Sequence, residues 1–117
     1  MIPSQMWKGI LDGCVLKVIS REETYGYEIS EALKAFGFTE IAEGTIYPLL
    51  LRLERNGLIA ATYRESPVGP RRKYFSITDA GLTELATFYN SWTQLASAIE
   101  TLFEGGAQNA SQSQSAQ

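Results

Sequence analysis

Apolar residues recur at spacings of three and four along four segments of the chain, which is the pattern of amphipathic helices. We expect helices over Gln5–Ser20, Thr24–Phe36 and Gly44–Asn56. A fourth helix begins at Thr78 and carries a coiled-coil-like apolar seam as far as Phe103. That seam is longer than one small domain can cover, so the pattern predicts a helix that pairs with a second chain.

Residues suited to helix ends stand at the expected boundaries. Thr24 and Thr78 carry an acceptor oxygen and are expected as N-caps. Gly37 and Gly57 follow apolar runs and are expected as C-terminal stops. Pro48 is compatible with the third helix only in or near its first turn.

The third predicted helix has two unlike faces. One face is apolar at about 100° per residue and consists of Ile46, Leu49, Leu50 and Leu53. The remaining surface consists of Tyr47, Pro48, Leu51, Arg52 and Arg55. Two short helices separated by a few residues, the second bearing outward arginines, match a helix-turn-helix.

Two alternating runs rich in β-forming residues follow, over Leu58–Glu65 and Arg71–Ile77, with a turn over Ser66–Pro70 between them. We therefore predict a mainly α fold with a β-hairpin wing. The predicted parts are a winged helix-turn-helix DNA-binding domain over 1–77, a C-terminal dimerisation helix over 78–104 and a disordered polar tail over 105–117.

Charge is unevenly distributed along the chain. The net charge is −3, yet residues 44–75 carry six basic and two acidic residues. Because the distribution matters more than the sum, this segment predicts a DNA-facing surface.

Several classes of function are excluded by composition. The chain has no histidine and one cysteine, Cys14, so it lacks the means for the usual zinc sites and for histidine-based catalysis. We expect no enzyme activity, no metal and no cofactor. No membrane span or signal peptide is predicted, which favours the cytoplasm.

Six short motifs in order resemble the PadR family of transcriptional regulators, in particular its compact branch. They are Thr24-Tyr25-Gly26-Tyr27-Glu28-Ile29, Gly44-Thr45-Ile46-Tyr47-Pro48-Leu49-Leu50, Arg52-Leu53-Glu54, Gly57-Leu58-Ile59, Arg71-Arg72-Lys73-Tyr74 and Ile77-Thr78-Asp79-Ala80-Gly81. The resemblance implies a homodimeric repressor whose first and last helices form the interface. In some members of the family a flat aromatic ligand binds there and releases the DNA.

Two positions depart from the family pattern. Leu51 stands where the family usually has a polar or basic residue. Ala42 stands where a cap for the third helix is expected and has no acceptor oxygen, which predicts a slightly weaker helix start.

Candidate contacts to double-stranded DNA come from the second and third helices and the wing. They are Tyr25, Tyr27, Thr45, Tyr47, Pro48, Arg52, Arg55, Arg71, Arg72 and Lys73. The alternatives are a solvated helix face for the arginines, edge-strand charges for the wing and core packing for the tyrosines. Strand alternation places Arg71 and Lys73 on one face and Arg72 on the other.

Aromatic residues gather at the predicted dimer interface and are candidates for binding a planar effector: Trp7, Phe88, Tyr89 and Trp92. If their rings fill the space, the seam is a dry core and the repressor is constitutive. The alternative to DNA binding is a winged-helix module for protein interaction, for which Leu51 is the one indication in the third helix.

Overall fold

The computed structural model describes residues 2–66 and 68–105. The chain divides into two units, Met1–Leu85 and Ala86–Gln117. The elements in order are α1 (Ser4–Trp7), α2 (Leu11–Arg21), β1 (Thr24–Tyr25), α3 (Gly26–Ala35), α4 (Glu43–Arg55), β2 (Ile59–Ser66), β3 (Gly69–Ile77) and α5 (Asp79–Glu104). The predicted fold, mainly α with a hairpin wing and a long last helix, is confirmed.

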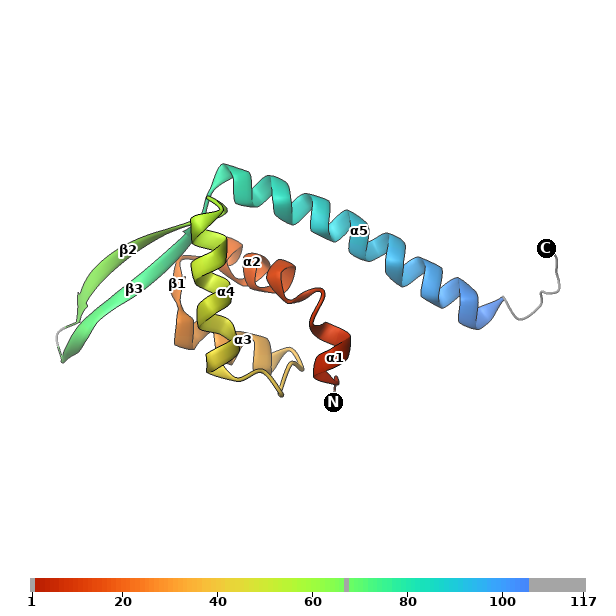
Figure 1. Cartoon of the computed structure of the whole chain (residues 1–117), viewed down its shortest axis with the longest axis horizontal. Coiled ribbons are helices and arrows are strands. Elements are labelled where there is room, and N and C mark those ends of the chain that lie inside the picture. Colours follow the sequence, from red (N-terminus) through yellow and green to blue (C-terminus); the bar gives the residue numbers. More distant parts are fainter. Residues whose placement is uncertain (1, 67, 106–117) are drawn as a thin grey trace. The chain divides into compact units, whose positions relative to one another are not determined.

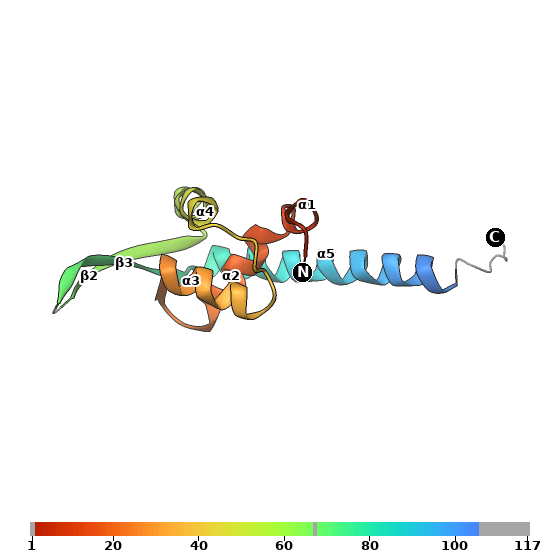
Figure 2. The same ribbon diagram turned by 90° about the horizontal axis from the view of Figure 1, so that it is seen from below.

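The first unit packs three helices around a small sheet. Helix α3 contacts both α2 and α4, and the sheet contacts α2 and α4 through its strands. In Figures 1 and 2 the β2–β3 hairpin extends beyond these three helices. The hairpin is therefore placed as a wing beside α4.

The first predicted helix is wrong in one respect, because it is broken into α1 and α2. A turn over residues 8–10 separates them, and the Ile10 N–H donates to the Trp7 carbonyl at 3.0 Å. Gly9 lies in this turn and is a poor helix former. Trp7 and Leu11, on either side of the break, are both buried.

The start of the second predicted helix is also wrong. Thr24 belongs to β1 and pairs with Phe75 of β3, so Tyr25, which has no side-chain capping bond among the described residues, takes the N-cap position. The Thr24 hydroxyl donates instead to Oε1 of Glu28 at 2.8 Å. A strand of two residues is too short to show the alternation that predicts strands.

Both glycine stops are confirmed. Gly37 has φ of 109° and Gly57 has φ of 77°, values that glycine adopts without strain. After α4, the Leu58 N–H donates to the Leu53 carbonyl at 3.0 Å, which closes the helix end in the Schellman manner.

Helix α4 begins at Glu43, one residue earlier than predicted, so Pro48 falls in its second turn. Because proline has no N–H, the Gly44 carbonyl loses its usual partner in the helix. Ala42 takes the N-cap position without a side-chain hydrogen bond among the described residues, as expected for a side chain with no acceptor oxygen.

The sheet is antiparallel with strand order β1-β3-β2. Strands β2 and β3 pair from Ile59↔Ile77 to Ser66↔Gly69, with an irregularity between Arg64 and Ser66. Strand β2 is shifted one residue later than predicted and β3 begins two residues earlier, and the Pro67 part of the predicted turn lies outside the described residues.

The core of the first unit is apolar and draws on every helix up to α4 and on two strands. Its buried members are Trp7, Leu11, Val15, Leu16, Ile19, Ile29, Leu33, Ile41, Ile46, Leu49, Leu50, Leu53, Ile59 and Phe75. Cys14 packs against this cluster, and burial raises the pKa of its thiol, which suits a structural rather than a reactive cysteine.

Helix α5 has the predicted start and its predicted cap. The Thr78 hydroxyl accepts from the Gly81 N–H at 3.0 Å and donates to the Gly57 carbonyl at 2.7 Å. The predicted tail over 105–117 lies, apart from Gly105, outside the described residues. No helix in the described part of the chain is long and apolar enough to cross a membrane.

The double role of Thr78 makes it a test of this junction. We expect Thr78→Ala to lower the free energy of unfolding by about 1 kcal/mol, since it removes the cap of α5. Thr93→Ala is the matched control, because the Thr93 hydroxyl only donates to a carbonyl within the same helix. Urea denaturation followed by circular dichroism measures both; equal losses for the two variants would contradict the capping role.

Candidate nucleic-acid interface

Helix α4 presents an exposed face opposite its core face. Ile46, Leu49, Leu50 and Leu53 are at most 5% exposed, as predicted. Tyr47 is 57% exposed and Leu51 is 37% exposed, and Pro48, Arg52 and Arg55 are exposed as well. The helix is therefore anchored by four aliphatic side chains while its other side is free to enter a groove.

Arg52 is held by a carboxylate of another helix. Its Nη2 lies 2.8 Å from both carboxylate oxygens of Asp12 in α2. Both side chains are about half exposed, so solvent screens the pair and its net contribution to stability is small. A phosphate or base that binds Arg52 would replace the Asp12 carboxylate.

The three basic residues of the wing point to both faces of the hairpin, as alternation predicts. Arg71 lies over the Tyr63 ring at 4.8 Å, and Tyr63 is the cross-strand neighbour of Lys73. Arg72 lies instead over the ring of Tyr25 at 4.6 Å. The face with Lys73 is therefore directed towards α4, and the other face carries Arg72 beside Tyr25 of the neighbouring strand β1.

Lys73 connects the wing with the candidate reading helix. Its Nζ lies 2.9 Å from Oε1 of Glu54 in α4, and this hydrogen bond raises the pKa of Lys73 above its usual value. The side chain is only 20% exposed. The wing and α4 are thus coupled at their adjoining sides.

Carboxylates face most of the cations on this surface. Besides the two pairs above, Arg64 pairs with Glu23, and Arg71 lies 3.5 Å from Glu65. Among the described residues, no ion pair is formed by Arg55 or Arg72, although Arg72 rests on an aromatic ring. Arg55 is therefore the candidate DNA-binding arginine whose charge is least compensated.

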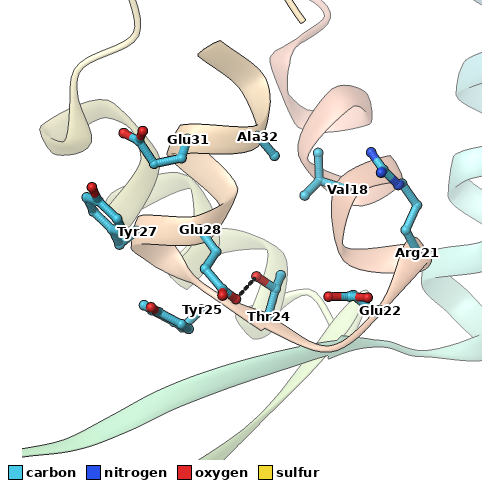
Figure 3. Close-up of a pocket in the computed structure, with 9 residues that line it drawn as sticks. All are labelled: Val18, Arg21, Glu22, Thr24, Tyr25, Tyr27, Glu28, Glu31 and Ala32. Carbon is cyan, nitrogen blue, oxygen red and sulfur yellow. Dashed lines mark hydrogen bonds between the residues drawn. The ribbon is translucent and has the colours of Figure 1, made fainter. Parts of the chain in front are cut away.

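Tyr25 and Tyr27 border a hollow of about 420 Å³ beside β1 and α3 (Figure 3). Three carboxylates line the same hollow, those of Glu22, Glu28 and Glu31. Their negative charge opposes a phosphate at this place, although Arg21 also lines it. Phosphate contact by the two tyrosines remains a prediction that this environment disfavours.

The four aromatic candidates for effector binding belong to different units. Trp7 is 3% exposed and lies in the core of the first unit, where its Nε1 has no hydrogen-bond partner among the described residues. Phe88, Tyr89 and Trp92 belong to α5 in the second unit, with Tyr89 63% and Trp92 39% exposed. Trp7 is thus a core residue of the first unit, and effector binding by these four residues stays a prediction.

Sequence reasoning did not identify the acidic partners on this surface. Asp12 and Arg52 are 40 positions apart, so no local spacing connects them. Glu54 was noted only as part of a motif, and its pairing with Lys73 depends on how the wing folds back on α4. The glutamates around Tyr25 and Tyr27 are close in sequence and could have been noticed.

An anchored helix with an exposed face, preceded by a second helix and followed by a two-stranded wing, defines a winged helix-turn-helix protein. Residues 15–87 match the transcriptional regulator PadR-like family. The chain belongs to this family and is a transcriptional regulator. The expectation that it is not an enzyme is confirmed by this membership.

Solved structures of the family agree with the fold. The chain is 50% identical to a PadR-like transcriptional regulator from Bacillus cereus strain ATCC 14579, with 87% of this chain and 99% of that chain covered and a TM-score of 0.79. It is 43% identical to a Streptococcus transcriptional regulator, with 87% and 100% covered and a TM-score of 0.77. An uncharacterized protein of Lysinibacillus sphaericus is 33% identical over 107 residues, which are 90% of this chain and 98% of that protein.

Proposed function

We propose that this regulator is a homodimeric repressor that binds an inverted-repeat operator in the cytoplasm, with α4 in the major groove and the wing along the backbone. The observation that carries the proposal is the exposed face of α4, flanked by a wing that Lys73 ties to Glu54. A two-fold dimer presents two such helices, which accounts for an inverted repeat with half-sites one or two helical turns apart.

Helix α5 supports the dimer. Its exposed large apolar residues continue along most of its length: Leu82, Tyr89, Trp92, Leu95, Ile99, Leu102 and Phe103. A contiguous apolar stripe of this length marks an interaction surface. The equivalent helix of a second chain is a self-complementary partner for it, as expected for an isologous interface.

DNA binding is tested on the least compensated arginine of α4. We expect Arg55→Ala to weaken binding to the operator about tenfold, the loss of a charge-assisted contact to a base or phosphate. The measurement is a gel shift or fluorescence anisotropy titration with DNA from upstream of the gene. Lys34→Ala is the control, because Lys34 is an exposed lysine of α3 that pairs with Glu31.

Unchanged affinity of Arg55→Ala and of the double variant Arg52→Ala/Arg55→Ala would rule out α4 as the reading helix. If the wild-type protein binds no DNA sequence specifically, the protein-interaction module becomes the better hypothesis. Repression itself is tested by transcription from the operator-bearing promoter in the presence of the protein. A rise in transcription would contradict the repressor assignment.

We also propose that a planar aromatic compound binds between the α5 helices of the dimer and releases the DNA. Trp92 and Tyr89 expose flat faces suited to stacking. A planar dye or phenolic acid should quench tryptophan fluorescence at micromolar concentration and weaken operator binding, and Trp92→Ala should lose both effects. Quenching that leaves operator affinity unchanged would leave the protein a constitutive repressor.

A further inference from the structure

Three residues of the exposed α4 face carry no hydrogen-bonding side-chain group. In a helix-turn-helix protein, the N-terminal residues of the recognition helix contact the base edges. Here Gly44, Pro48 and Leu51 have no polar side-chain atom, while the exposed arginines lie in the last turn. Thr45 and Tyr47, which are also exposed, carry hydroxyl groups. Apolar surface on this face is therefore available for contact with base edges.

Leu51 is the aliphatic side chain at the centre of this surface. It is 37% exposed, whereas the aliphatic residues on the other side of α4 are buried. It stands four residues after Tyr47 and four residues before Arg55, about 40° from each around the helix axis. Leu51 therefore lies on the ridge that these two exposed residues define.

The neighbours of Leu51 suit contact with DNA rather than with an apolar protein surface. Arg55 follows on the same ridge and forms no ion pair among the described residues. Lys73 of the wing is paired with Glu54, on the same side of the helix as Tyr47. In this setting the Leu51 side chain can bury its methyl groups in a groove of the DNA. The neighbouring cations and the Tyr47 hydroxyl can contact phosphates and base edges at the same time.

The major groove offers one apolar group for such a side chain, the 5-methyl group of thymine. We propose that Leu51 is a specificity-determining residue that packs against the thymine methyl of one base pair in each half-site. This proposal rests on the proposed function, since it names the base that the same helix reads. A two-fold dimer carries two copies of Leu51, so the operator holds two such thymines in symmetric positions.

The test replaces each thymine of the operator, one at a time, with deoxyuridine, which removes only the methyl group and leaves the protein unchanged. At one thymine in each half-site, the affinity of the wild-type protein should fall about fourfold, the effect of exposing one methyl-sized group. Replacing both symmetric thymines should lower it about sixteenfold if the two contacts act independently. For Leu51→Ala, thymine and deoxyuridine at these positions should be bound equally well.

Phe36→Ala is the matched control, because Phe36 is also an exposed apolar residue, at 67%, but follows α3 outside the α4 surface. This variant should keep the full sensitivity to deoxyuridine. If every deoxyuridine is tolerated by the wild type, or if Leu51→Ala keeps the sensitivity, the thymine contact is wrong although operator binding stands. If the protein binds no DNA sequence specifically, the proposed function itself fails.

Discussion

Gly81→Ala should lower the free energy of unfolding by about 3 kcal/mol, the upper part of the range for overpacking. A Cβ at this position would lie 2.1 Å from the Leu58 carbonyl oxygen and 2.7 Å from Cγ1 of Ile77. The carbonyl cannot move aside easily, because it accepts the Thr78 N–H at 3.1 Å. The added methyl group would therefore separate the start of α5 from the strand ends beneath it.

Gly44→Ala is the matched control for this prediction. A Cβ built on Gly44 meets no atom within 4 Å beyond its chain neighbours and the backbone of its own helix, and the positive φ values among the described glycines belong to Gly37 and Gly57. Alanine should therefore raise the stability by up to about 1 kcal/mol through its higher helix propensity. Urea unfolding at one fixed protein concentration compares both variants with the wild type; a stable Gly81→Ala protein would contradict the close approach.

Trp92→Asp should raise the dissociation constant of the proposed dimer by roughly a hundredfold or more. A carboxylate buried without a partner costs several kcal/mol, and every 1.4 kcal/mol is about tenfold in affinity. Sedimentation at several micromolar concentrations distinguishes a chain of 12.9 kDa from a species of about twice that mass.

The control is Gln94→Asp, which adds the same charge two positions further along α5. At about 100° per residue this position faces away from Trp92, so the dimer should persist. A wild-type protein that sediments as a monomer, or a Trp92→Asp variant that remains dimeric, would exclude this face of α5 as the interface.

The sequence was sufficient to predict those parts of the fold that depend on local periodicity. The two faces of α4 follow from four aliphatic residues at helical spacing, and the glycine stops follow from the φ that a Schellman end requires. The wing follows from two alternating runs around a turn. The long last helix follows from its apolar seam, and its cap at Thr78 follows from the acceptor oxygen of the threonine side chain.

The parts that failed depend on contacts between distant segments. Thr24 leaves the second helix because β3 offers it a strand partner, Phe75, which lies 51 positions later and cannot be found from local spacing. The break after Trp7 places an aromatic ring in the core at the expense of one helical turn. The pairing of Asp12 with Arg52 likewise cannot be predicted from local spacing, because the two residues are 40 positions apart.

The carboxylates that pair with the surface cations affect how a DNA-binding regulator distributes between its operator and the rest of a genome. Any stretch of DNA offers phosphates, and sequence-independent binding draws on them alone. In the proposed complex, Arg52 and Lys73 would exchange the carboxylates of Asp12 and Glu54 for phosphates, so a chance stretch of duplex would gain little from either. Fewer molecules are then held on the millions of competing sites, and a small number of copies suffices to occupy the operator.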